Sequence, residues 1–401
     1  MNPFIEHLKP YPFERLNRLT RSIQPADDFP PISLAMGEPR HPAPDFLLDA
    51  LSDRELLLTS LGKYPTTVGV EALRRAIADW CDRRYSLEGA LCPEQQLLPL
   101  KGTREGLFSF TQAVMSKTPG SLMIIPNPFY QIYEGAALLA GATPYFLNDP
   151  GPDQSYAAVL KKVPEQVWQK CELMVVCNPG NPTGRVLSME ELHQLMELAD
   201  RYDFLLASDE CYAEIYLDEA HPPAGLLQAC RTAGRSDFKR CLVFHSLSKR
   251  SNVPGLRSGF IAGDAEVMAH YLKYRTYHGG AMPIHAQTVS TLAWQDEVHV
   301  VENRRLYREK FHQVTPLLQQ VLKVGMPDAS FYLWAEVPGG DDEQFARDLY
   351  REKNVTLLPG SYLSREHNGV NPGQGFVRMA LVAEPDQCLE AAHRLVDFLT
   401  R

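Results

Sequence analysis

The chain has 401 residues, of which 44% are hydrophobic, and its formal net charge at pH 7 is -9. This length exceeds what one hydrophobic core usually serves, so two domains are expected in a globular protein. The acidic balance argues against nucleic acid or an anionic membrane surface as the main partner, since both attract a concentrated positive face. Any anion-binding site must therefore be local.

The eight cysteines show no CxxC spacing, and several lie in apolar runs. This pattern fits reduced thiols better than disulfides or a zinc site, which indicates a cytoplasmic protein. The first seven residues carry charge and proline where a signal peptide needs an apolar core. No apolar run approaches the length of a membrane span, so no membrane partner is expected.

Residues 1 to about 45 are rich in proline and show little periodicity. We therefore expect an arm, rather than a domain, that lies extended over the rest of the protein. Within this arm, residues 32–39 are typical of a short strand that ends in a glycine turn at Gly37.

From residue 70 onward the apolar pattern alternates between helices and short strands. Helices are predicted at 70–85, 107–115, 135–140 and 188–202, the last with a capping box formed by Ser188 and Glu191. Strands are predicted at 97–100, 121–125, 173–177, 204–207 and 241–244. Strand–loop–helix units that repeat about every 30 residues predict an α/β fold, with a mostly parallel sheet and helices on both faces.

The C-terminal part has a different pattern, which predicts a small α+β domain. After a helix at 265–274 and a long helical run from about 298 to 322, strands are predicted at 330–335, 356–358 and 376–381, and helices at 342–352 and 386–399. We expect residues 1–45 to form the arm and part of the small domain, residues 46–295 the large domain, and residues 296–401 the small C-terminal domain.

Small and polar residues follow five of the predicted strands, where a parallel sheet presents its ligand-binding edge. These loops contain Gly102 with Thr103, Tyr130, Asn181, Asp209 with Tyr212, and Ser246 with Ser248 and Lys249. Gly102 and Thr103 stand at the start of a predicted helix, where free N–H groups and the helix dipole favour phosphate.

Lys249 follows a buried strand and two serines, and Arg257 lies eight residues further on. Hydroxyls and a guanidinium suit an anionic ligand, and a lysine without a nearby carboxylate can serve as a Schiff-base amine. Alone, this stretch is more typical of a solvated strand end. Arg378 lies inside an apolar strand, and a half-buried arginine requires an anion.

Four stretches together carry a resemblance that none carries alone. Asn-Pro-Gly-Asn-Pro-Thr-Gly at 178–184, Ser-Asp-Glu-Cys-Tyr at 208–212, Ser-Leu-Ser-Lys at 246–249 and Arg257 occur in this order and spacing. In these motifs, and across nearly its whole length, the chain resembles the fold-type I aminotransferases that depend on pyridoxal phosphate. The resemblance implies a transaminase with pyridoxal 5'-phosphate as cofactor, no metal, and a seven-stranded-type sheet in the large, cofactor-binding domain.

The resemblance also implies a role for each motif residue. Lys249 resembles the lysine that bonds to the cofactor and shuttles a proton, and Asp209 resembles the aspartate that keeps the ring nitrogen protonated. Asn181 and Tyr212 resemble the pair that hydrogen-bonds the phenolic oxygen, and Tyr130 the aromatic that stacks on the ring. The remaining cofactor contacts, mostly to the phosphate, are implied for Gly102, Thr103, Arg104, Ser246, Ser248 and Arg257. Tyr64 would reach in from a second subunit, so a homodimer is implied.

For the substrate, Arg378 resembles the arginine that clamps the α-carboxylate, with Gly37 and Asn181 beside it. Aspartate aminotransferases bring a further arginine to the site from the neighbouring subunit, and the matching stretch 279–283 has none. The sequences of residues 37–44, 246–259, 358–363 and 369–373 most resemble those of the bacterial succinyldiaminopimelate aminotransferases. These enzymes act in lysine and cell-wall precursor synthesis. Glutamate as donor and N-succinyl-2-amino-6-oxopimelate as acceptor are thus implied, and Arg40, Arg250 and Arg275 are candidates for binding a distal carboxylate.

Several alternatives stay open at this point. The same scaffold supports other aminotransferases, of alanine, aspartate or LL-diaminopimelate type, and pyridoxal-phosphate-dependent β-lyases. A regulator built on this fold needs an added DNA-binding domain, for which residues 1–45 are too short and too rich in proline. A nicotinamide-dependent Rossmann enzyme is disfavoured because no GxGxxG follows an early strand.

Overall fold

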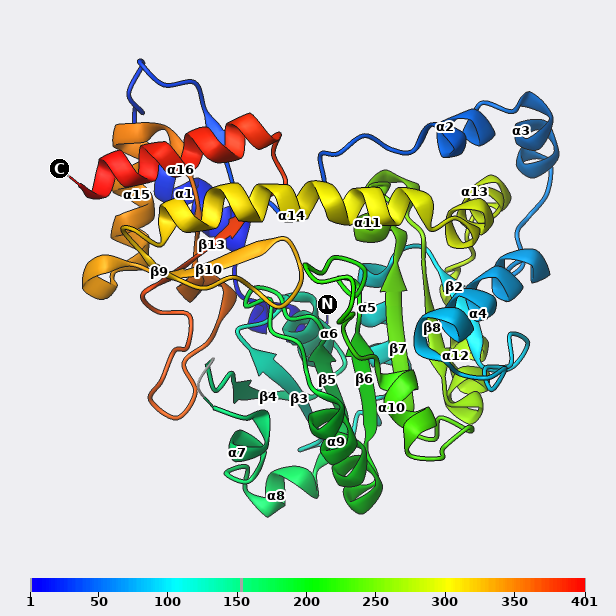
Figure 1. Ribbon diagram of the computed structural model, residues 1–401. Helices are drawn as coiled ribbons and strands as arrows, with labels where there is room; N and C mark the ends of the chain where they lie inside the picture. Colours follow the sequence, from blue (N-terminus) through cyan, green and yellow to red (C-terminus); the bar gives the residue numbers. More distant parts are fainter. Residues whose placement is uncertain (1, 152–153, 401) are drawn as a thin grey trace.

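The structure is a computed structural model that describes residues 2–151 and 154–400, and a seven-stranded sheet forms its centre (Figure 1). The strand order is β2-β8-β7-β6-β5-β3-β4. The strands are β2 (Leu97–Leu100), β3 (Leu122–Asn127), β4 (Thr143–Asn148), β5 (Cys171–Cys177), β6 (Leu205–Asp209), β7 (Cys241–Ser246) and β8 (Gly259–Gly263). Only β8 runs antiparallel to its neighbours in this sheet, which confirms the predicted, mostly parallel architecture.

Helices cover both faces of this sheet. One face packs against α4 (Glu71–Tyr85), α9 (Met189–Tyr202), α10 (Leu226–Thr232) and α13 (Ile284–Gln295). The other face packs against α5 (Thr103–Val114), α6 (Ile132–Leu139) and α12 (Ala265–His278). The strands are therefore apolar on both sides, which is why they appear in the sequence as continuous hydrophobic runs.

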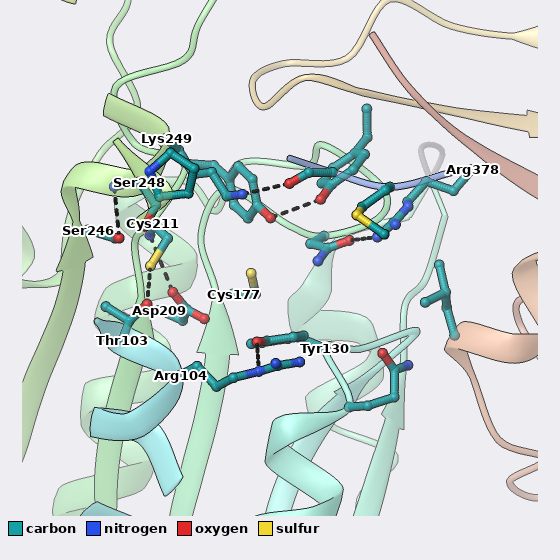
Figure 2. A pocket seen from close by; sticks show the side chains of 18 of the residues that line it. Thr103, Arg104, Tyr130, Cys177, Asp209, Cys211, Ser246, Ser248, Lys249 and Arg378 are labelled. Carbon is teal, nitrogen blue, oxygen red and sulfur yellow. Dashed lines mark hydrogen bonds between the residues drawn. The ribbon is translucent and has the colours of Figure 1, made fainter. Parts of the chain in front are cut away.

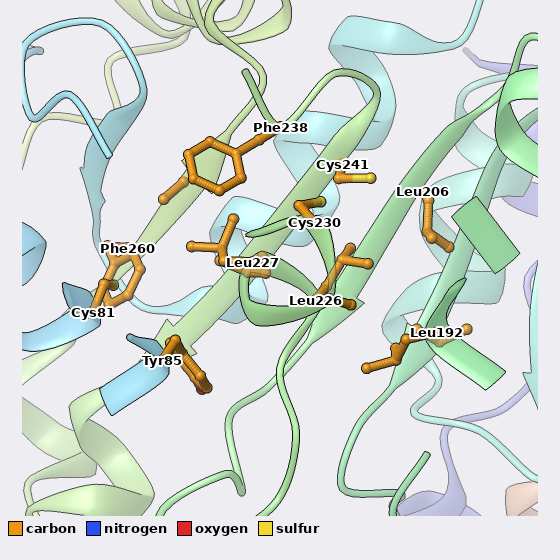
Figure 3. Packing of buried hydrophobic residues seen from close by; sticks show 14 of the residues in the cluster. Cys81, Tyr85, Leu192, Leu206, Leu226, Leu227, Cys230, Phe238, Cys241 and Phe260 are labelled. Carbon is orange, nitrogen blue, oxygen red and sulfur yellow. The ribbon is translucent and has the colours of Figure 1, made fainter. Parts of the chain in front are cut away.

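Successive residues of β7 show how the two cores share one strand. Cys241 and Val243 belong to the first core, and Leu242 and Phe244 to the second. On the first face, Leu226, Leu227 and Cys230 of α10 lie beside β7 (Figure 3). Because both faces are closely packed, the carboxyl edge of the sheet is a rigid support for the loops that follow the strands.

A smaller antiparallel sheet lies in the C-terminal part, in the order β12-β13-β10-β9. Its strands are β9 (Lys323–Val324), β10 (Tyr332–Glu336), β12 (Leu358–Pro359) and β13 (Phe376–Ala380). A third core joins this sheet to α15 (Asp342–Lys353), α16 (Pro385–Leu399) and the C-terminal half of α14 (Val298–Leu318). Helix α14 runs from this sheet towards α11 (Leu247–Arg250) and α13 beside the large sheet (Figure 1).

The N-terminal arm departs from the prediction of an extended segment. It contains η1 (Pro3–His7) and α1 (Pro12–Thr20), and its strand β1 (Ile32–Ser33) pairs with β11 (Val355–Thr356). The proline content of residues 1–45 led to the prediction of an extended arm, but Pro12 occupies the first turn of α1, where the missing N–H has no intrahelical role. Leu16 then anchors α1 in a small core beside Leu358 and Tyr362.

The remaining elements connect these layers. Helices α2 (Asp45–Leu51) and α3 (Arg54–Leu61) were not predicted and pack on α13. The short elements are α7 (Tyr156–Leu160), α8 (Glu165–Trp168), η2 (Pro254–Leu256), η3 (Pro338–Gly340) and η4 (Gly360–Leu363). Within residues 2–151 and 154–400, no helix has the length and apolar character needed to cross a membrane.

Candidate active site

A cavity of about 460 Å³ lies at the carboxyl ends of the central strands, and the arm and the small sheet contribute to its wall. The structure brings most of the predicted site residues together in its lining. These are Gly37, Thr103, Arg104, Tyr130, Asn181, Asp209, Tyr212, Ser246, Ser248, Lys249, Arg257 and Arg378. Gly102 borders the cavity next to Arg257, whereas Tyr64 does not reach the cavity of its own chain.

Lys249 lies in α11, the short helix that follows β7, and its amine points into the cavity (Figure 2). The Nζ atom donates a hydrogen bond to the backbone oxygen of Gly37 at 2.6 Å. Burial lowers the pKa of Lys249 to about 8, and the nearby charges of Arg378 and Arg257 act in the same direction. A lysine with this pKa is partly neutral near pH 7 and can act as a nucleophile.

Asp209 ends β6 and is 4% exposed at the base of the cavity. The Tyr133 hydroxyl donates to its Oδ2 at 2.6 Å, and the Cys211 N–H donates to its Oδ1 at 3.3 Å. Burial raises the pKa of Asp209, and the hydrogen bonds from Cys211 and Tyr133 oppose that rise. A carboxylate held in such a place is stabilised by a cationic group of a ligand.

One end of the cavity fits a phosphate group. Thr103 begins α5, and Ser246, which ends β7, and Ser248, in α11, lie close to it (Figure 2). Gly102 has a φ of +83°, and a Cβ at this position would collide with the Arg257 guanidinium. Hydroxyls, a guanidinium and a helix N-terminus are donors suited to a phosphate dianion. The donor set at this end of the cavity therefore matches the phosphate of the implied cofactor.

Arg378 lies in the middle of β13 and is 4% exposed. Its guanidinium donates to Asn181 Oδ1 at 2.9 Å and to the backbone oxygen of Ala35 at 2.8 Å, and it lies 4.4 Å from the ring centroid of Tyr332. Its Nε has no hydrogen-bond partner among the residues described. A buried guanidinium bonded only to neutral groups favours an anionic ligand.

Some residues of this cavity were not predicted from the sequence. The Tyr332 hydroxyl lies 3.0 Å from that of Tyr212, and a Cβ on Gly37 would collide with it. Tyr133 of α6 does not line the cavity but supports Asp209, and its place three residues after Tyr130, in the segment that follows β3, was an available signal. Tyr11 reaches the cavity from the arm, and nothing local in the sequence indicates that contact.

The structure contradicts the distal-carboxylate roles considered for Arg40, Arg250 and Arg275, because none of the three lines the cavity. Arg250 is 1% exposed and pairs with Glu297 at 2.5 Å. Arg275 is fully buried and pairs with Glu105 at 2.7 Å. Arg40 is exposed outside the cavity. Short sequence distances to site residues were misleading here, since neighbouring side chains point in different directions.

The fold and the site together define a fold-type I pyridoxal-phosphate enzyme. Residues 30–395 match the family described as aminotransferase class I and II, and the chain belongs to this family. It is therefore a transaminase, and members of this family use pyridoxal phosphate. No group of metal-ligating side chains is present in the part of the chain that the structure describes.

Similar proteins agree with this assignment. The chain is 31% identical to the LL-diaminopimelate aminotransferase of Desulforudis audaxviator, across 99% of this chain and 97% of that protein. A crystal structure of an aminotransferase from Neisseria meningitidis superposes with a TM-score of 0.94, at 47% identity and with complete coverage of both chains. A probable N-succinyldiaminopimelate aminotransferase from Thermus thermophilus superposes with a TM-score of 0.83 at 26% identity, covering 96% of this chain and 99% of that chain.

Proposed function

We propose that the cavity binds pyridoxal phosphate through Lys249 and transfers an amino group between glutamate and an oxo-acid acceptor. When bound, the cofactor supplies an electron sink for the bond that breaks at the substrate α-carbon. Lys249 Nζ would take the proton from the α-carbon of the amino donor and, in the other half of the cycle, deliver a proton to the α-carbon that receives the amino group. The lowered pKa of Lys249 supports this role, because a neutral amine is required to accept a proton.

Other residues would hold and tune the cofactor. Asp209 pairs with the ring nitrogen, and the Tyr133 hydroxyl fixes the orientation of this carboxylate. Asn181 and Tyr212 hold the phenolic oxygen, and Tyr130 covers the ring. The phosphate is held by the backbone at Gly102, Thr103 and Arg104 and by the following side chains: Thr103, Ser246, Ser248 and Arg257. This assignment is supported by the presence of Thr103, Arg104, Ser246, Ser248 and Arg257 in the cavity lining, with Gly102 next to Arg257.

The substrate α-carboxylate would bind Arg378, with the Gly37 backbone alongside. Bidentate binding by a guanidinium fixes the plane of a carboxylate, and this orients the bond that reacts at the α-carbon. The free Nε of Arg378 and its neutral partners support the assignment.

We also propose a homodimer in which Tyr64 completes the site of the partner subunit. Tyr64 is 99% exposed and lies between α3 and α4, so its hydroxyl is free to enter another chain's cavity. Mixing the inactive variants Tyr64→Ala and Lys249→Ala should restore activity, because a hybrid dimer contains one intact site. Absence of recovery, despite subunit exchange shown by mass spectrometry, would contradict this role. A cytoplasmic location is in keeping with the eight free cysteines.

For the acceptor we propose N-succinyl-2-amino-6-oxopimelate rather than unacylated 2-amino-6-oxopimelate, whose amination product is diaminopimelate. One observation carries this choice: Asp209 is the sole carboxylate in the cavity lining, among the residues described. Asp209 is committed to the cofactor ring, so nothing in this lining pairs with the distal ammonium group of free diaminopimelate. Acylation removes that positive charge, and an unpaired charge in a partly desolvated site is costly.

A substrate panel tests this choice directly. Purified holoenzyme should transaminate N-succinyl-LL-2,6-diaminopimelate with 2-oxoglutarate, the reverse of the proposed reaction. Its kcat/KM for this substrate should exceed that for LL-diaminopimelate, alanine or aspartate by at least about tenfold, which corresponds to about 1.4 kcal/mol. Equal or higher efficiency on LL-diaminopimelate would favour the activity named for the Desulforudis audaxviator relative.

A further inference from the structure

Arg104 occupies an unusual position in the cavity lining. It is the second residue of α5, yet its side chain turns away from Ser246 and Ser248 and lies beside Tyr130 (Figure 2). Its Nε donates to the Tyr130 hydroxyl at 2.8 Å, and another nitrogen of the guanidinium donates to the Tyr11 hydroxyl. The side chain is thus held by two phenols, one from the large sheet's loops and one from the arm.

No carboxylate lies within ion-pairing distance of Arg104 among the residues described. Arg365, which lies close by at a neighbouring cavity, is instead neutralised by Glu134 at 2.6 Å. Tyr11 and Tyr130 only accept hydrogen bonds from Arg104, so each phenol keeps its own O–H as a donor. A guanidinium without a carboxylate partner and two hydroxyl groups with available O–H donors form a site suited to a carboxylate.

The position of this group relative to Arg378 matters for the substrate. Arg104 lines both the active-site cavity and a second cavity of about 460 Å³, which also contacts Tyr11 and Gln131. It therefore marks the outer boundary of the active site, whereas Arg378 lies across the cavity on the small sheet (Figure 2). A substrate long enough to reach this boundary presents its terminal group to Arg104.

We propose that Arg104, held by Tyr11 and Tyr130, binds the terminal carboxylate of the acyl group on the substrate. This inference rests on the proposed function, and it assigns substrate selectivity to a residue of the same chain. The Arg104 side chain then has no role at the cofactor phosphate, and only the Arg104 backbone is assigned to that group. Tyr11 is a positioning residue for the guanidinium, so the arm takes part in substrate selection.

The experiment compares two acylated substrates on holoenzyme, N-succinyl-LL-2,6-diaminopimelate and N-acetyl-LL-2,6-diaminopimelate. They differ in the acyl group, and only the succinyl group ends in a carboxylate. In Arg104→Gln, kcat/KM for the succinyl substrate should fall about tenfold to a hundredfold, because a hydrogen-bonded charge pair is lost. The value for the acetyl substrate should stay within about twofold, well below one such charged contact. Equal losses on both substrates would overturn the assignment to the terminal carboxylate.

Further variants and a binding measurement separate the remaining explanations. Tyr11→Phe should lower the succinyl-to-acetyl preference in the same direction as Arg104→Gln but by less, and Arg104→Lys should restore part of it. Arg40→Gln, which removes an exposed cation outside the cavity, should leave the preference unchanged. Cofactor affinity from absorbance titration should be unaltered in Arg104→Gln, and a clear loss of affinity would assign the side chain to the phosphate instead. If wild-type enzyme does not use the succinyl substrate at all, the proposed function itself fails, and this inference fails with it.

Discussion

Two sets of basic side chains in this protein differ in their partners. In the cavity, Lys249, Arg104, Arg257 and Arg378 are hydrogen-bonded to backbone oxygens, phenols and an amide, and none forms an ion pair among the residues described. In the interior, carboxylates pair with every member of a second set, namely Arg84 with Glu214, Arg250 with Glu297, Arg275 with Glu105, and Arg304 with Glu214 and Glu219.

This difference shows how the same residue type serves structure in one place and binding in another. A buried cation without a counter-ion destabilises the protein unless a ligand brings the negative charge. Lys249 and Arg378 are such cations, and the exposed Arg104 and Arg257 add two more unpaired charges at the same cavity. Together they indicate a site built for a ligand with several anionic groups. Carboxylates already compensate the charges of the paired arginines, so replacing these arginines should affect folding rather than catalysis.

The largest effect is expected in the cavity at Lys249. Lys249→Ala should lose turnover by many orders of magnitude, because the variant lacks both the amine that bonds to the cofactor and the base that moves the proton. The variant should remain folded and should still bind pyridoxal phosphate non-covalently, as measured by circular dichroism and absorbance. Substantial residual turnover would remove Lys249 from the reaction.

Arg378→Gln should reduce kcat/KM by about thirtyfold or more, since loss of a desolvated charge partner costs about 2 to 5 kcal/mol in binding. Its stability should change little without ligand, because the guanidinium has no counter-ion to lose. The urea midpoint of the apoprotein measures this second quantity. A large loss of stability with intact kcat/KM would show that Arg378 serves folding, like the ion-paired arginines of the second set.

The opposite outcome is expected for Glu214, which is 5% exposed between Arg84 and Arg304. Glu214→Gln should lower the free energy of unfolding by about 2 to 3 kcal/mol, since two buried guanidinium groups lose a counter-ion. The value of kcat/KM should be nearly unchanged. Glu309→Gln, in an exposed pair with Arg305, is the matched control and should lower the free energy of unfolding much less than Glu214→Gln.

A smaller, pH-dependent effect follows from the lowered pKa of Lys249. Only the neutral amine attacks the cofactor aldehyde, and lowering the pKa of a cation shifts its neutral form to lower pH. Recapture of pyridoxal phosphate by the apoprotein should therefore speed up about tenfold between pH 7 and a plateau above about pH 9. A rate that still climbs at pH 10, like that of a free lysine in the same buffers, would contradict the lowered pKa.

Much of the large sheet and several loops of the site were predictable from local patterns. The strand before Lys249, the capping box of Ser188 and Glu191, and the glycine turn at Gly102 each depend on residues close in sequence. The parallel arrangement then places the strand ends at one edge, which is why Asp209 and Lys249 could be expected in a single site.

Two of the contacts missed in the site depend on segments that are distant in sequence. Tyr332 faces Tyr212 only because the small sheet lies against the large one, and Tyr11 meets Arg104 only because the arm folds back over α5. The misassignment of Arg250 has a local cause, since it is adjacent to Lys249 but points into the interior towards Glu297. Sequence proximity gave no information on side-chain direction in a helix as short as α11.

Borohydride reduction of the holoenzyme, followed by peptide mapping, tests whether Lys249 is the residue that bonds to the cofactor. The purified protein should be yellow, and reduction should bleach its absorbance band and attach the pyridoxyl group irreversibly to one lysine. The label should be recovered on Lys249, and Lys249→Ala should remain unlabelled under the same conditions. Recovery of the label on any other lysine would contradict the assignment of this cavity as the catalytic site.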